Sequence, residues 1–94
     1  MNKSIAIVGG GFAGLGTAYY LIKNGFPGKK ITIFENNSYV GGLASGIKTS
    51  EWMWPVDRVI HHWFTSDHWA LDIAKEIGLQ DSIIIKNTKS SSYY

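Results

Sequence analysis

The stretch IAIVGGGFAGLGTAYYLIKNGFPGKKITIFE, residues 5–35, decides the fold. Its first four residues, Ile5–Val8, are apolar and predict a strand of the kind that is buried on both faces of a parallel sheet. The pattern G-x-G-x-x-G follows at residues 9–14, and an amphipathic helix is predicted from about residue 12 to residue 24. A second strand is predicted at Ile31–Phe34. Strand, glycine turn, helix and strand in this order predict a βαβ unit that binds the adenosine half of a dinucleotide.

Each glycine of this motif has its own chemical reason. Gly9 allows a sharp turn, Gly11 allows the backbone to approach a pyrophosphate, and Gly14 allows the helix to pack closely on the strand. The helix would begin at the phosphates, with its free N–H groups and positive dipole end facing them. Glu35 follows Gly14 by 21 residues, close to the roughly 20 expected for the acid that binds ribose hydroxyls. An acid here disfavours a 2′-phosphate, and therefore NADP.

Composition narrows the class of protein. A chain of 94 residues allows at most one domain, and a net charge of +2 with scattered lysines argues against a nucleic-acid partner. The chain has no cysteine, which excludes disulfides, thiolate metal sites and a cysteine-linked flavin. The absence of cysteine fits a reducing compartment, and we expect a cytoplasmic location.

An alternative interpretation is a membrane or signal segment, because residues 5–22 carry no charge. The glycines of this segment cluster at one point, and Tyr19 and Tyr20 lie near its end. The membrane interpretation also leaves Glu35 without a role. We therefore expect no transmembrane segment.

The rest of the chain is less specific. The doublet Gly41-Gly42 is either a flexible loop or a second close approach of backbone to the phosphates. Residues 51–64 are rich in aromatic side chains and form either core or a wall for cofactor and substrate. A second helix is predicted between an N-cap at residues 65–67 and a terminating Gly78, and a short strand is predicted at residues 82–86.

These elements predict an α/β fold: the N-terminal βαβ unit of a Rossmann-like FAD/NAD(P)-binding domain, with an incomplete parallel sheet. Residues 1–94 would form the N-terminal part of this domain. Residues 1–46 would hold the βαβ unit and the doublet, and residues 47–94 the aromatic segment, a helix and the start of the next strand. Because two parallel strands alone are marginal, we expect the chain to be the N-terminal part of a longer protein or to be completed by another molecule.

Three motifs together resemble the FAD-dependent amine oxidase superfamily. They are V-G-G-G-F-A-G-L at 8–15, F-E at 34–35 and G-G-L-A-S at 41–45. This superfamily includes protoporphyrinogen oxidase-like and phytoene desaturase-like flavoenzymes, and UDP-galactopyranose mutase is a relative. In these proteins a G-G doublet after the ribose acid lies along the FAD pyrophosphate, so the resemblance implies FAD rather than NAD as the cofactor.

The sequence departs from the superfamily pattern beside the doublet. Tyr39 stands where members often carry Arg or Lys, and Leu43 stands where some members carry Arg. The resemblance and the motif together give these candidate cofactor-binding residues: Gly9, Gly11, Phe12, Ala13, Gly14, Glu35, Asn36, Gly41, Gly42, Leu43 and His62.

His62 enters through a second resemblance. Residues 55–79 resemble both a His-His-aromatic-aromatic-x-Ser-Asp element of protoporphyrinogen oxidase-like proteins and an element near the flavin ring of the mutase. The match with the mutase element implies that His62 lies near the isoalloxazine. The alternative is a hydrogen-bonded histidine in an aromatic wall. We expect no metal at His61 and His62, because no further ligands accompany them at a recognised spacing.

The resemblance implies a flavin-dependent oxidoreductase in which the substrate passes a hydride from a C–N or C–C bond to flavin N5. One alternative is a flavin-dependent sugar-nucleotide mutase, and another is a nucleotide-binding module without activity. No catalytic residue is identified in this chain. A small-molecule substrate would be bound by residues outside it, so we expect the 94-residue chain alone to be inactive.

Overall fold

The computed structural model describes residues 2–59, 62–89 and 91–93. The chain divides into two compact units, Met1–His61 and His62–Tyr94. The predicted subdivision of one domain at residue 46 stays a prediction. Each unit is described by itself below.

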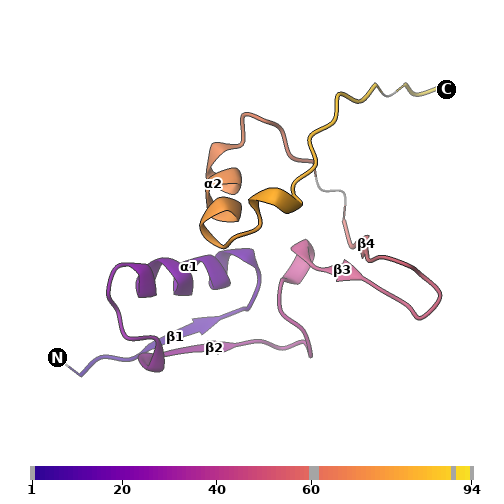
Figure 1. The fold of residues 1–94 in the computed structure, drawn as a ribbon. Coiled ribbons are helices and arrows are strands. Elements are labelled where there is room, and N and C mark those ends of the chain that lie inside the picture. The colour runs from indigo at the N-terminus through magenta and orange to yellow at the C-terminus, as the bar shows by residue number, and fades with distance from the viewer. Residues whose placement is uncertain (1, 60–61, 90, 94) are drawn as a thin grey trace. The chain divides into compact units, whose positions relative to one another are not determined.

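The first unit contains the predicted βαβ arrangement (Figure 1). Strand β1 spans Ile5–Val8, helix α1 spans Phe12–Lys23 and strand β2 spans Ile31–Phe34, with a short 3-10 turn at Gly28–Lys30 before β2. The two strands pair in parallel, with Ile5 opposite Ile31 and Val8 opposite Phe34. Because parallel strands need a crossover, α1 is the connection that allows this pairing. The βαβ prediction is confirmed.

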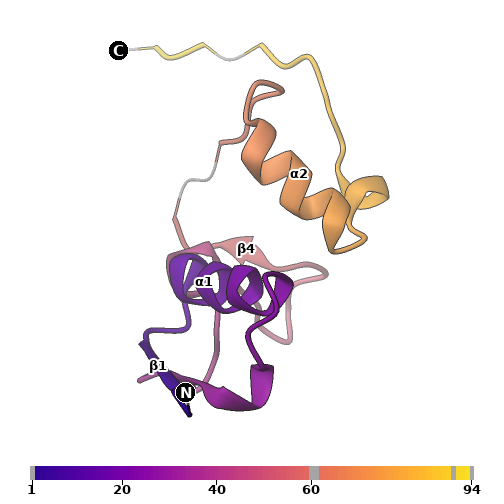
Figure 2. The ribbon, with the colours of Figure 1, turned by 90° about the vertical axis from the view of Figure 1, so that its left-hand side faces the viewer.

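Helix α1 covers one face of this two-stranded sheet (Figure 2). Burial alternates along both strands, and the half-buried positions include Ile7, whose Cγ2 lies against the helix at Gly14. On the other face Val8 is 89% exposed and Phe34 is 56% exposed. The prediction that Ile5–Val8 is buried on both faces is therefore wrong for this chain, since a single helix supplies a single covering layer. The core of the unit centres on Ala18 of α1.

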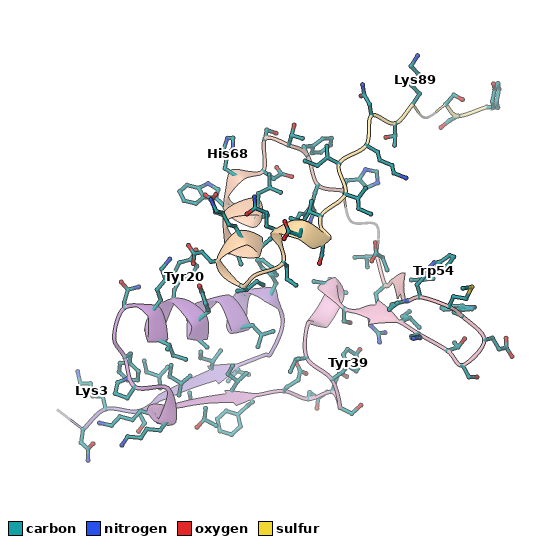
Figure 3. All side chains as sticks on the ribbon, in the orientation of Figure 1. Lys3, Tyr20, Tyr39, Trp54, His68 and Lys89 are labelled. Atoms are coloured by element: carbon teal, nitrogen blue, oxygen red, sulfur yellow. The ribbon has the colours of Figure 1, made fainter. Side chains whose placement is uncertain are left out.

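The first unit also contains a small hairpin that the sequence did not predict. Strand β3 spans Gly46–Ile47 and pairs antiparallel with β4, Val56–Asp57. The connecting loop carries Trp52, Met53 and Trp54, all of them exposed, and Figure 3 shows Trp54 on this loop. The interpretation of these side chains as core is wrong, because a two-residue ladder offers no apolar face to cover them.

The second unit is built around helix α2, His68–Glu76. Asp67 precedes the helix, and its Oδ2 accepts a hydrogen bond of 2.8 Å from the Phe64 N–H. Ala74 is buried, whereas Trp69 is 82% exposed. His68 is exposed on the first turn (Figure 3). The predicted helix is confirmed.

Both helices end in the same way. The Phe26 N–H donates to the Leu21 carbonyl across Gly25, and the Leu79 N–H donates to the Ala74 carbonyl across Gly78. The two glycines have φ of +90° and +81°. This is the Schellman motif, in which glycine takes the left-handed conformation that other residues adopt at a cost.

The predicted strand at residues 82–86 is absent. Gln80–Ser82 forms a 3-10 turn, and residues 83–89 have no regular structure. Ile84 and Ile85 are 78% and 69% exposed. Three β-branched residues favour extended backbone, but a strand also needs a neighbouring strand to satisfy its N–H and C=O groups, and the described residues offer none here.

The uncharged stretch 5–22 is divided into β1, the glycine turn and part of α1. Across residues 2–59, 62–89 and 91–93, every helix is too short or too polar to cross a lipid bilayer.

Candidate functional site

The glycine turn between β1 and α1 is shaped by two glycines that the fold itself requires. Gly9 has φ of +102°, and its N–H donates to the Phe34 carbonyl at 2.7 Å, which extends the β1–β2 pairing into the turn. At Gly14 a Cβ would collide with the carbonyl oxygen of Gly9. Gly9 therefore permits the turn and Gly14 permits the close approach of α1 to it, as the motif predicts.

Gly11 differs from both. Its backbone is extended, with φ of −78° and ψ of −172°, a conformation open to any residue. A Cβ at Gly11 would meet only the Cα of Gly42, at 4.0 Å. Neither backbone strain nor a clash within the chain requires glycine at this position. The space in front of Gly11 is instead available to a ligand that approaches the backbone closely.

The N-terminus of α1 is prepared for an anion. Gly11 is the N-cap, no side chain caps the helix, and no acidic residue lies in its first turn. The Leu15 N–H makes the bond to the Gly11 carbonyl that begins the helix, at 3.0 Å. The N–H groups of Phe12, Ala13 and Gly14 precede that bond, so they lie outside the i→i−4 ladder, at the positive end of the helix dipole. A phosphate fits this position.

Glu35 lies at the same turn. Its Oε1 accepts a hydrogen bond of 3.0 Å from the Gly10 N–H, and its Oε2 accepts one of 2.8 Å from the Asn37 N–H. These two bonds, that to Asn37 first, hold the pKa of Glu35 below its usual value, with a smaller contribution from the Asn36 N–H. An ionised carboxylate has about four acceptor sites, so it retains capacity for ribose hydroxyls.

The doublet Gly41-Gly42 packs against this turn. The Gly41 N–H donates to the Gly10 carbonyl at 2.8 Å, and Gly11 and Gly41 form a parallel bridge. A Cβ on Gly42 would lie 3.3 Å from the Gly11 Cα. The interpretation of the doublet as a free loop is therefore wrong, and its close approach to phosphates stays a prediction. We call these paired turns, residues 9–14 and 41–42, the glycine cradle.

The structure places the remaining predicted residues less tightly. Asn36 is exposed beside Glu35, and Leu43 is 70% exposed in the 3-10 turn Gly42–Ala44. His62 is exposed and belongs to the second unit, so a position near a flavin ring stays a prediction. His61 lies outside the described residues. Within the part of the chain that the structure describes, no three His, Cys, Asp or Glu side chains are grouped to hold a metal ion.

Two residues beside the cradle were not predicted. The Ser45 hydroxyl donates to the Gly42 carbonyl at 2.7 Å and accepts a bond of 2.8 Å from Arg58 Nε. The Arg58 guanidinium carbon lies 4.4 Å from the centroid of the Tyr39 ring. Ser45, three residues after Gly42, has the spacing of a serine that bonds local backbone. Arg58 gave no such signal, because its position depends on the unpredicted β3–β4 hairpin.

Comparison with known proteins agrees with this geometry. Residues 7–77 match the family described as the NAD(P)-binding Rossmann-like domain. The chain is also 33% identical over 93 residues to coproporphyrinogen III oxidase of Staphylococcus aureus (strain NCTC 8325 / PS 47). That alignment covers 99% of this chain but 19% of the relative, so the chain spans about a fifth of the length of this curated relative. No solved structure gives a significant match.

Both findings support the resemblance to the FAD-dependent amine oxidase superfamily. The matched region contains the glycine turn, Glu35 and the doublet, which are the parts that the structure brings together. The chain belongs to the family of NAD(P)-binding Rossmann-like domains.

Proposed function

We propose that this chain binds FAD through the glycine cradle, as the N-terminal part of a flavin-dependent oxidoreductase. The observation that carries the proposal is Gly11: its backbone suits any residue and the space beside its Cα is open, yet it is glycine. A pyrophosphate against this backbone accounts for the choice, with the uncapped N-terminus of α1 supplying N–H donors.

The doublet supports FAD over a nicotinamide dinucleotide. Gly42 places a second stretch of backbone without a side chain beside Gly11. In the flavoenzymes that this chain resembles, the corresponding doublet lies along the FAD pyrophosphate. Glu35 supports NAD or FAD over NADP, because its carboxylate lies at the turn where a ribose would sit and would repel a 2′-phosphate. The family description, NAD(P)-binding, keeps NAD as the second candidate ligand.

The similarity to a coproporphyrinogen III oxidase favours an oxidase over a sugar-nucleotide mutase. Bound FAD would supply a two-electron acceptor for a hydride. In this chain Phe12, Ala13 and Gly14 would donate N–H groups to phosphate oxygens, and Glu35 would hold ribose hydroxyls. Substrate contacts and a cytoplasmic location stay predictions.

The test is a direct comparison of ligands with the 94-residue chain. Binding of FAD, NAD and NADP is measured by isothermal titration calorimetry, and FAD binding also by the change in flavin fluorescence. We expect FAD to bind most tightly and NADP least. Tighter binding of NAD than of FAD would replace the flavin proposal by a nicotinamide one, and a folded chain that binds none of the three would contradict it.

A further inference from the structure

Arg58 stands beside the cradle in a position fixed from two sides. Its Nε donates to Ser45 Oγ at 2.8 Å, and its guanidinium lies over the Tyr39 ring, 4.4 Å from the ring centroid. Ser45 in turn donates to the carbonyl of Gly42. Ser45 therefore links the Arg58 guanidinium to the backbone of the glycine doublet through two successive hydrogen bonds. An exposed arginine that is held by an aromatic face and a hydroxyl loses less conformational freedom when it binds a ligand than a free one does.

The other cations of this unit are arranged differently. Lys3 precedes β1, and Lys29 and Lys30 precede β2, so all three belong to the end of the sheet opposite the cradle; Figure 3 shows Lys3 there. Lys23 lies in the last turn of α1, and Lys30 Nζ is bonded to Asn2. Only Lys48 and Arg58 follow the doublet in the described part of this unit.

The cradle itself has little positive charge to offer. A pyrophosphate carries negative charge on both phosphates, whereas a helix N-terminus is equivalent to roughly half a unit charge. Glu35 adds a negative charge at the same turn. A guanidinium has five N–H donors, and the bond to Ser45 uses the one on Nε. Its flat face and forked donors suit phosphate oxygens.

We propose that Arg58, positioned by Tyr39 and Ser45, is the cationic contact of this site to the pyrophosphate of the bound dinucleotide. This inference rests on the proposed function. It identifies a positively charged side chain for the pyrophosphate, which neither the glycine motif nor the doublet contains. Tyr39 supplies the ring on which the guanidinium lies, so its role is to position Arg58 and not to touch the phosphate.

The test compares Arg58→Gln with Lys48→Gln, which removes the same charge from an exposed residue of the same hairpin. FAD affinity is measured at about 50 and about 300 mM salt by titration calorimetry, with far-UV circular dichroism as a check on folding. We expect Arg58→Gln to bind about three- to tenfold more weakly at low salt and to lose part of the salt dependence. Lys48→Gln should match the unchanged chain.

A second comparison separates a phosphate contact from a structural role. ADP carries a pyrophosphate and adenosine does not. Arg58→Gln should therefore weaken the binding of ADP and leave the affinity for adenosine unchanged. Tyr39→Phe keeps the aromatic face and should retain the affinity, whereas Tyr39→Leu should weaken it less than Arg58→Gln does.

The outcomes distinguish the two proposals. If the unchanged chain binds FAD and Arg58→Gln binds it equally well at both salt concentrations, the Arg58 contact is wrong and the flavin site stands. If the affinities for ADP and for adenosine fall equally, Arg58 acts only through the fold, and the proposed contact with the pyrophosphate is again wrong. If the folded, unchanged chain binds neither FAD nor ADP, both proposals fall together.

Discussion

The two helices of this chain have matching C-termini and contrasting N-termini. Both end in a Schellman motif around a glycine of positive φ. Neither helix has a side-chain cap bond or an acid in its first turn, but the residue before each helix differs. Helix α2 follows Asp67, which places a carboxylate beside the helix N-terminus and accepts a bond from the Phe64 N–H, whereas α1 follows Gly11, which has no side chain. A helix that has its own carboxylate has its dipole offset locally. The α1 terminus is left for an anion from outside the chain.

The largest expected effect comes from closing the space at Gly11. Gly11→Val should weaken FAD binding by more than about a hundredfold, about 3 kcal/mol, because the side chain would occupy the place of the pyrophosphate. The fold should persist, since the backbone conformation is open to any residue and a Cβ there meets no atom closer than 4.0 Å.

The matched control for this substitution is Gly16→Val in the same helix, where a Cβ would meet nothing within 4 Å. It should bind FAD as the unchanged chain does, in the same calorimetric titration. Retained binding in Gly11→Val would remove the basis for the glycine fingerprint.

A carboxylate placed in the first turn of α1 would bring a negative charge to its N-terminus, as Asp67 does just before α2. Ala13→Asp should weaken FAD by about tenfold or more through repulsion of the phosphates. The same change should slightly raise the thermal unfolding midpoint of the chain, because an acid favours a helix N-terminus. Ala13→Asn, of similar size and without charge, is the control, and equal FAD affinities for the two variants would show that no anion binds there.

Glu35 gives a pH-dependent effect of similar or smaller size. Its pKa lies below the usual value of 4.5, so its bonds to the Gly10 and Asn37 N–H groups stabilise the folded turn above about that pH. This stabilisation is lost as the pH falls through the lowered pKa. Urea unfolding of the chain between about pH 3 and pH 7 should therefore show a decline at the acid end.

Glu35→Gln should flatten that decline and weaken FAD by roughly tenfold, since an amide is a poorer acceptor for ribose hydroxyls than a carboxylate. An unchanged affinity would show that Glu35 serves the turn and not the ribose. The two readouts are independent, because the urea midpoint is measured without ligand.

The smallest effect belongs to α2. Asp67→Ala should lower the stability of the second unit by about 1 kcal/mol, because the carboxylate loses its bond from the Phe64 N–H and the helix loses a negative charge beside its N-terminus. FAD affinity should not change. Circular dichroism at 222 nm during urea unfolding measures the loss of stability. A loss of FAD affinity in this variant would contradict the proposal that the N-terminus of α1, and not that of α2, binds the cofactor.

The parts of the fold that sequence predicts are those encoded locally. Residues 5–35 contain apolar runs, a spaced glycine turn and a helix stop at Gly25, and each of these acts within a few residues. The contact of Gly41 with Gly10 was not predicted, because it depends on how far the chain travels after β2. The residue types alone left the doublet open between a flexible loop and a close approach to phosphates, and the approach to phosphates, which the resemblance favoured, stays a prediction.

The parts that sequence did not predict depend on partners distant along the chain. Arg58 has its position because β4 pairs with β3, and two-residue strands show no alternation to read. The Ile83–Ile85 run has the composition of a strand, but no neighbouring strand in the described chain pairs with it. The placement of His62 relative to a flavin depends on atoms outside this chain, and its role stays a prediction.

The backbone bonds that close the cradle restrict how the connection between its two turns can change over evolution. The Gly9 N–H is bonded to the Phe34 carbonyl and the Gly41 N–H to the Gly10 carbonyl, so residues 35–40 connect two fixed points. Residues 36–40 are all exposed, and most of their side chains are free to vary. An inserted residue, however, would shift Gly41 out of register with Gly11. Homologous chains that keep Arg58 should therefore keep an aromatic residue at Tyr39 and the number of residues in this connection, and should vary more in its other residues.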